Sequence, residues 1–166
     1  MSVKQRTIKN SVTISGVGLH TGKQTNLTFL PAPEQNGARI HTTEHVLAAL
    51  VGLEIDNVLM QMDGPEMPIM DGSSMPFIEI LEKAGTVEQN AERVYFELTE
   101  NLSYEDPVKK VEMLAVPQGE FRTTVMVDYN SEVLGTQHAS MYNVRQFKSE
   151  IAPCRTFVFL HELEAL

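Results

Sequence analysis

The stretch TTEHVLAALVGL, at residues 42–53, carries the pattern that decides the fold. Its large apolar residues recur at the spacing of one helix face, and they are Val46, Leu47, Leu50 and Val51. A threonine at position 42 or 43 can act as the N-cap, and Gly52 can end the helix. The pattern therefore predicts a helix over residues 42–52.

A strand, an irregular loop and a second helix are predicted directly after it. Residues 57–62, NVLMQM, favour a strand, whereas DGPEMPIMDG at residues 63–72 contains too many Gly, Pro and Asp residues for regular structure. The second helix is predicted over residues 74–84, with a serine as N-cap, a proline in its first turn and Gly85 at its end.

Upstream of the first helix, the pattern is typical of β-structure. Short apolar runs at residues 12–14 and 27–30 flank GVGLHTG, residues 16–22, and together they predict a β-hairpin. The glycines have the spacing G-x-G-x-x-x-G with no strong helix pattern after them, which favours a tight turn over a dinucleotide site. The Asn-Gly pair at residues 36–37 predicts another reversal before a short strand at residues 38–40.

Downstream, the polar run TVEQNAERV at residues 86–94 predicts a boundary between two units. Further elements are then predicted from β-branched and apolar runs: strands at residues 94–98, 111–116, 121–127 and 155–160, and a helix at residues 141–151. We therefore expect an α+β chain in two parts, residues 1–88 and residues 89–166.

The composition excludes several classes of function. The formal net charge of -9 argues against a nucleic-acid partner, because binding to the phosphate backbone requires a basic surface. The single cysteine, Cys154, cannot form an intrachain disulfide, and we expect a cytoplasmic protein. No run reaches the roughly 18 apolar residues of a membrane helix, so no membrane span is predicted.

The sharpest chemical signal is HTTEH, at residues 41–45. A neutral imidazole binds Zn²⁺, and a neighbouring carboxylate that does not bind the metal can take a proton from water. On spacing alone two other interpretations stay open. Glu44 can complement the positive end of the helix beside an ordinary His45, or His41 and His45 can both bind metal as in the inverted zinc-protease motif H-x-x-E-H. The protease is weakened because His41 precedes two threonines that favour the cap position, which predicts that His41 lies outside the helix.

The remaining ionisable residues give no site by themselves. Asp63, Glu66 and Asp71 do not have the spacing of a calcium loop, and we expect them to cap turns. His138 and His161 are isolated in the sequence and complete no catalytic triad.

Taken in order, several motifs point to one family: KQRTI with GVGLHTG, then TTEHVLAALVGLEIDNV, PEMPIMDGSSMPF and RTFVFLHELE. They resemble the zinc-dependent UDP-3-O-acyl-N-acetylglucosamine deacetylases over almost the whole chain, and most closely the form fused to a 3-hydroxyacyl-carrier-protein dehydratase. The resemblance implies an α+β fold of two similar units, each a sheet with helices packed on one face. These units form a β-α-α-β sandwich, which is incomplete here.

The resemblance also implies a reaction and a set of site residues. The reaction is removal of the acetyl group from UDP-3-O-acyl-N-acetylglucosamine, the committed step of lipid A biosynthesis, with Zn²⁺ as cofactor. Glu44 is then the general base, His45 a zinc ligand, and Thr156 a catalytic group that stabilises the oxyanion. The residues implied to bind the substrate are Leu19, His20 and Phe157.

Two departures from the family pattern limit this expectation. After Glu34 the family carries a further segment that is missing here, and the chain stops after Leu166, before the H-K-x-x-D motif that supplies the other zinc ligands. Because a catalytic zinc site needs three protein ligands, we expect the 166-residue polypeptide alone to be an inactive fragment of that enzyme. We also expect exposed sheet edges to pair with another chain.

Overall fold

The computed structural model describes residues 4–18, 21–30 and 40–164 of the chain, and it divides them between two compact units. The first unit comprises Met1–Arg93 and Arg145–Leu166, and the second comprises Val94–Val144. The two α+β units predicted at residues 1–88 and 89–166 stay a prediction. The predicted turn at residues 36–37 and the strand at residues 38–40 lie outside the described residues.

The first unit contains a three-stranded antiparallel sheet of β2 (Val12–Val17), β3 (Gln24–Leu30) and β4 (Leu59–Met62), in the order β2-β3-β4. The hairpin and the strand predicted for these segments are therefore confirmed. Along β3, alternate residues are buried, because successive side chains of a strand point to opposite faces. The buried face of the sheet is the one that the helices cover.

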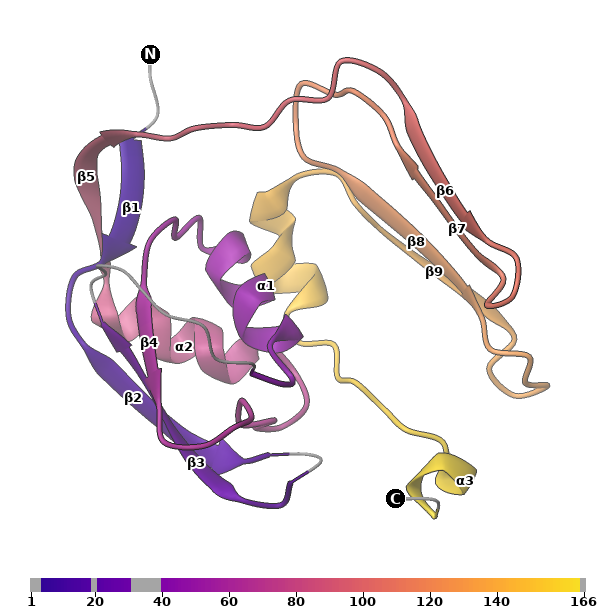
Figure 1. Cartoon of the computed structure of the whole chain (residues 1–166), viewed down its shortest axis with the longest axis horizontal. Coiled ribbons are helices and arrows are strands. Elements are labelled where there is room, and N and C mark those ends of the chain that lie inside the picture. The colour runs from indigo at the N-terminus through magenta and orange to yellow at the C-terminus, as the bar shows by residue number, and fades with distance from the viewer. Residues whose placement is uncertain (1–3, 19–20, 31–39, 165–166) are drawn as a thin grey trace. The chain divides into compact units, whose positions relative to one another are not determined.

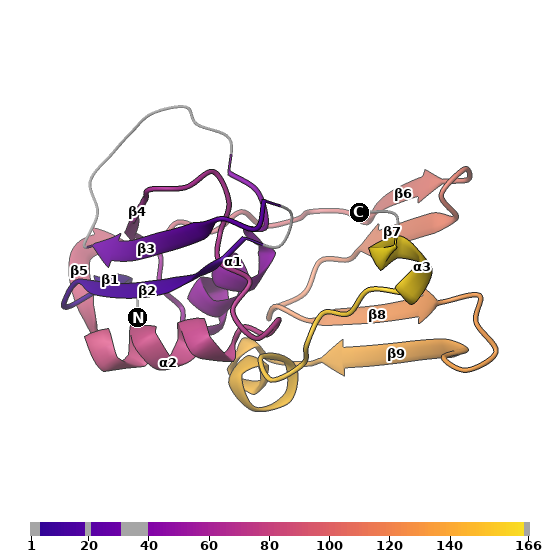
Figure 2. The same ribbon diagram turned by 90° about the horizontal axis from the view of Figure 1, so that it is seen from below.

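Two helices pack with this sheet, as the sequence predicts. Helix α1 (Glu44–Gly52) follows Thr43 at the N-cap position, and helix α2 (Met75–Ala84) follows Ser74 and ends before Gly85. Helix α2 lies alongside β2 and contacts α1 (Figure 2). The core between these elements consists of apolar side chains from the sheet, the loop and the helices, among them Leu27, Phe29, Val46, Met67, Phe77 and Leu81.

Most of the polar run predicted to be a boundary forms a strand, and the two compact units divide at its end, between Arg93 and Val94. Strand β5 (Thr86–Glu92) pairs antiparallel with β1 (Lys4–Ile8), with Ile8 opposite Thr86 (Figure 1). Most side chains of β5 stay exposed, so the run shows none of the alternation that identifies a half-buried strand. Its backbone partner β1 lies almost a whole unit away in the sequence and cannot be inferred from local pattern.

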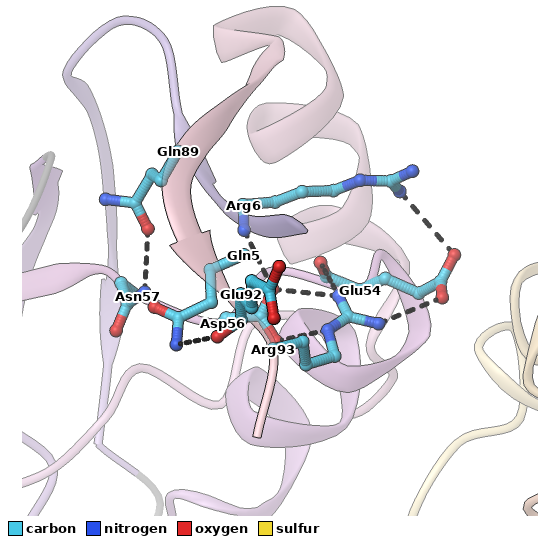
Figure 3. Close-up of polar contacts among 8 residues, drawn as sticks. All are labelled: Gln5, Arg6, Glu54, Asp56, Asn57, Gln89, Glu92 and Arg93. Atoms are coloured by element: carbon cyan, nitrogen blue, oxygen red, sulfur yellow. Dashed lines mark hydrogen bonds and ion pairs between the residues drawn. The ribbon is translucent and has the colours of Figure 1, made fainter. Parts of the chain in front are cut away.

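A group of charged side chains fixes this strand pair to the turn after α1 (Figure 3). The Arg93 guanidinium lies 2.7 Å from Asp56 Oδ1 and 3.4 Å from Glu54 Oε1. The Arg6 backbone N–H donates to Asp56 Oδ2 at 2.8 Å, and the Arg6 side chain pairs with Glu54 at 3.5 Å. The end of β5 is therefore held by ion pairs and hydrogen bonds rather than by apolar packing.

The second unit contains two antiparallel hairpins and no α-helix among its residues, all of which the structure describes. One hairpin pairs β6 (Leu102–Asp106) with β7 (Val111–Ala115), and the other pairs β8 (Thr123–Asp128) with β9 (Thr136–Met141). The strands predicted at residues 111–116 and 121–127 are thus confirmed. The strand predicted at residues 94–98 is wrong, because this segment has no regular structure and Phe96 is 92% exposed.

The C-terminal segment returns to the first unit without the regular elements predicted for it. In place of one helix at residues 141–151, a 3-10 turn (Val144–Gln146) precedes a single π-helical turn (Phe147–Ile151). The strand predicted at residues 155–160 is wrong. Residues 155–159 have no regular structure, and they lead into α3 (Leu160–Leu163).

The α+β class is confirmed by this combination of small antiparallel sheets and short helices. Among the described residues, every helix is too short or too polar to cross a membrane.

Candidate functional site

The predicted general base and zinc ligand occupy the first turn of α1. Glu44 is its first residue and is exposed, and His45 follows it and is half-buried. The helical hydrogen bond from the Leu47 N–H to the Thr43 carbonyl, at 3.0 Å, closes this turn. Glu44 and His45 are therefore both accessible at the amino-terminal end of a helix that is anchored by buried Val46.

His41 lies outside the helix, as predicted. Its N–H donates to the Pro65 carbonyl at 3.3 Å, and its carbonyl accepts from the Met67 N–H at 3.1 Å. These bonds form an isolated parallel bridge with Glu66, and His41 lies three positions before Glu44, the first residue of α1. His41 and His45 are thus not one helical turn apart on a common face, which the inverted protease motif requires.

The loop before α2 connects the start of α1 to the segment that contains Thr156. The Ser74 hydroxyl donates to the His45 carbonyl at 3.0 Å, and the Ser74 N–H donates to the Ala152 carbonyl at 3.1 Å. The Thr156 N–H donates to the Gly72 carbonyl at 2.8 Å. Two predicted site residues far apart in the sequence, His45 and Thr156, are therefore held by neighbouring residues of one loop.

Gly72 has a conformation that suits this role. Its φ is +83°, in a region that L-residues rarely adopt, and a Cβ placed there would lie 3.6 Å from Thr156 Cγ2. A side chain at this position would add backbone strain and occupy the space beside Thr156.

Asp71 caps a turn, as predicted, whereas Asp63 binds the distant strand β3 instead of its own turn. Asp71 Oδ1 accepts hydrogen bonds from the Ser73 hydroxyl at 2.7 Å and the Ser73 N–H at 3.0 Å, while Arg155 lies 3.4 Å from Oδ2. The Ser73 hydrogen bonds, aided by the Arg155 charge, hold the pKa of Asp71 below its usual value. Asp63 accepts from the Asn26 N–H and side-chain amide, which lowers its pKa in the same way.

The remaining predicted residues are less constrained by the structure. Phe157 is 56% exposed, and its ring meets Phe159 edge-on, with centroids 5.6 Å apart and planes at 83°. Leu19 and His20 lie outside the described residues. The catalytic, metal-binding and substrate-binding roles given to all these side chains stay predictions.

The described residues do not form a complete zinc site. No three His, Cys, Asp or Glu side chains within the described ranges lie together in a way that could hold a metal ion. A catalytic zinc site needs three protein ligands, so His45 can supply at most part of one.

The sequence predicted that Glu66 caps a turn, but the structure shows that it is fully buried and binds two distant threonines. Its Oε2 accepts from the Thr21 N–H at 3.0 Å and the Thr21 hydroxyl at 2.9 Å, and its Oε1 accepts from the Thr42 hydroxyl at 2.7 Å. The available signal was an acidic residue enclosed by apolar and proline neighbours in PEMP, which is an unusual setting for a solvated side chain.

A family model described as UDP-3-O-acyl N-acetylglycosamine deacetylase matches residues 5–39 and 36–166. The match is in two pieces that meet where the resemblance predicts a missing family segment.

Individual relatives agree with this match. The chain is 39% identical over 201 residues to the "Bifunctional enzyme LpxC/FabZ" of Chlorobaculum tepidum, covering 100% of this chain and 43% of the relative. It is 34% identical to the UDP-3-O-acyl-N-acetylglucosamine deacetylase of Syntrophotalea carbinolica and 33% identical to that of Pasteurella multocida. Each of these alignments covers 99% of this chain, with 64% and 66% of the respective relatives. The chain thus spans less than half the length of the bifunctional relative. It spans just under two thirds of the length of each of the other two.

Proposed function

The chain belongs to the UDP-3-O-acyl N-acetylglycosamine deacetylase family, and on that premise we propose that it carries part of a deacetylase active site. The proposed substrate is UDP-3-O-acyl-N-acetylglucosamine, the compound named in the deacetylase relatives. The observation that carries the proposal is the connection of His45 and Thr156 through Gly72 and Ser74. Through these bonds the backbone at His45 and the backbone at Thr156, which are far apart in the sequence, are attached to one loop.

The proposed reaction is hydrolysis of the acetamido group. A water oxygen adds to the carbonyl carbon, the carbon–nitrogen bond breaks, and acetate and a free sugar amine are released. Glu44 accepts a proton from the attacking water. Its exposed position at the amino-terminal end of α1 is suitable for this role. The Thr156 hydroxyl donates a hydrogen bond to the oxygen that becomes negative in the transition state.

We propose Zn²⁺ as the cofactor, with His45 as one ligand. Bound zinc polarises a carbonyl group and lowers the pKa of water. Because the described residues do not complete a ligand set, the steps assigned above concern protein groups alone.

We further propose that the reaction serves lipid A biosynthesis. The predicted absence of nucleic-acid partners and the cytoplasmic location stay predictions. The protease alternative has no supporting observation, because His41 lies outside α1.

The proposal is tested by comparing zinc content and acetate release in the full-length protein and in the 166-residue polypeptide, each checked by intact mass. Full-length protein should hold about one zinc per chain, as a three-ligand site does, and the 166-residue polypeptide should hold little and release no acetate. In the full-length protein, Glu44→Gln should lower kcat by about 10²- to 10⁴-fold while zinc is retained.

Two histidine variants separate the deacetylase from the protease. In the full-length protein His45→Ala should lose zinc, whereas His41→Ala should retain it. Equal zinc loss in both variants would support the inverted motif, and acetate release unaffected by Glu44→Gln would contradict the proposed base.

A further inference from the structure

The buried Glu66 carboxylate joins two segments that are far apart in the sequence. Thr21 belongs to the glycine turn between β2 and β3, and Thr42 immediately precedes the N-cap of α1. Both donate hydrogen bonds to Glu66, at 2.7–3.0 Å. A fully buried carboxylate is costly unless donors compensate it, so these bonds are expected to be maintained in the folded protein.

Thr42, at one end of this link, has a strained backbone conformation. Its φ is +58°, which is unfavourable for a β-branched residue, and such strain persists only where surrounding contacts enforce it. The bond from its hydroxyl to Glu66 is one such contact, and the bridge between His41 and Glu66 is another. The strained residue turns the chain into α1, two positions before Glu44.

At the other end of the link, Gly18 allows the glycine turn to lie close to the Glu66 carboxylate. A Cβ at Gly18 would overlap Glu66 Oε2 and the Thr21 hydroxyl, so only glycine allows the turn to approach the carboxylate. The Gly22 N–H donates to the Gly18 carbonyl at 2.9 Å and closes the turn. The turn therefore depends on both the glycine and the carboxylate.

We propose that Glu66 is a positioning residue that fixes the first turn of α1, with Glu44 and His45, relative to the glycine turn. The proposal rests on the proposed function, because it assigns Glu66 to the site that those two residues form. Glu66 does not touch the reacting atoms. It acts through Thr42 on the catalytic end of the helix and through Thr21 on the turn.

The first test compares Glu66→Ala and Glu66→Gln in the full-length protein. Glu66→Ala should lower kcat on the order of 10- to 100-fold, because small displacements of catalytic groups have large effects on rate. Glu66→Gln should restore most of the rate. Its amide oxygen can accept from Thr21, and its NH₂ can donate to the Thr42 hydroxyl. An unchanged kcat in Glu66→Ala would overturn the proposal.

A second comparison assigns the effect to Thr42. Thr42→Val replaces the hydroxyl with a methyl group and should lower kcat. The loss caused by Glu66→Ala should then be smaller in that background than in the wild type. Thr7→Val is the matched control. Among the described residues the Thr7 hydroxyl is buried without a hydrogen-bond partner, so its removal should leave kcat unchanged. Fully additive effects of the Thr42 and Glu66 changes would contradict a link through Thr42.

Amide hydrogen exchange separates local positioning from general destabilisation and does not depend on activity. Glu66→Ala should speed exchange of the Thr21 and Leu47 amides, while the sheet amide of Leu27 keeps its protection. Equal acceleration at all three amides would indicate a purely structural role and overturn the proposal. If the wild-type protein releases no acetate, the proposed function fails, but these amides still decide whether Glu66 holds the two segments.

Discussion

The two compact units are both built mainly from antiparallel strands, yet only the first has a hydrophobic core. In the first unit, strand residues such as Phe29 and helix residues such as Phe77 are fully buried. In the second unit, Met141 is the single buried residue among Val94–Val144, all of which the structure describes. Both units contain antiparallel strand pairs, so the presence of such pairs alone does not account for the difference.

Helices account for it. A hairpin satisfies the backbone hydrogen bonds of its strands but buries little apolar surface, and an isolated two-stranded hairpin is at best marginally stable. In the first unit α1 and α2 contact each other, and α2 contacts β2 of the three-stranded sheet. In the second unit every residue of β8 is exposed, apolar and polar alike. The comparison indicates that the stability of the chain resides in the first unit.

The largest difference in stability between the two units is expected when one phenylalanine in each is changed to alanine. Phe77→Ala should lower the free energy of unfolding by about 3–5 kcal/mol, because the side chain is fully buried and leaves a cavity. Phe96→Ala, at a residue that is 92% exposed, should change it by no more than about 0.5 kcal/mol. Urea unfolding of both variants measures the difference, and comparable losses would show that the second unit is as tightly packed as the first.

An intermediate effect is expected at the charged cluster of Figure 3. Partial burial tends to raise the pKa of Asp56, but hydrogen bonds from the Arg93 side chain and the Arg6 backbone, with the charges of both arginines, hold the pKa below its ordinary value of 3.8. Asp56→Asn should therefore lower the free energy of unfolding at neutral pH by about 1.5–3 kcal/mol, the usual range for hydrogen bonds to a charged group.

The stability that Asp56 contributes should depend on pH. A carboxyl group with a depressed folded-state pKa stabilises the fold fully above its unfolded value of 3.8, and this contribution disappears as the pH falls through the folded pKa. The difference between wild type and Asp56→Asn should thus shrink on acidification below 3.8. In the second unit Asp106 only caps an exposed turn through the Val108 and Lys109 amides, so Asp106→Asn is the matched control and should cost less. A larger loss at Asp106 would reverse the comparison.

The same contrast explains which parts of the fold the sequence predicts. The helices α1 and α2 were predicted from helical periodicity and capping residues, and β2 and β3 from apolar runs flanking a glycine turn. Strand β5 was missed because TVEQNAE is polar on both faces and takes its register from distant β1. The segment at residues 94–98 has strand-like composition but no partner strand, and it remains irregular.

The candidate site divides in a similar way. Glu44 and His45 adjoin in sequence and form a recognisable pattern, whereas the partners of Glu66 include Thr21, which lies 45 positions away. The contact between Gly72 and Thr156 likewise depends on tertiary structure. Local patterns can identify reactive residues, but the groups that position them emerge only when distant segments are brought together.

The smallest effect on stability, and the sharpest test of the second unit as an exposed surface, is expected from Met126→Lys. Met126 lies in β8 and is 74% exposed, so the change should alter the free energy of unfolding by no more than about 0.5 kcal/mol. We expect the chain to self-associate through exposed strand edges and apolar side chains of this kind, and a lysine on an edge hairpin should weaken that association. Sedimentation velocity over a range of protein concentrations measures this association.

The matched control is Val51→Lys on α1, where an exposed apolar residue of the first unit receives the same charge. Either lysine makes the net charge of -9 less negative, which by itself favours association, so a decrease seen only with Met126→Lys must come from the β8 surface. Equal behaviour of the two variants, or a wild-type chain that stays monomeric at all concentrations, would remove the second unit as the interface.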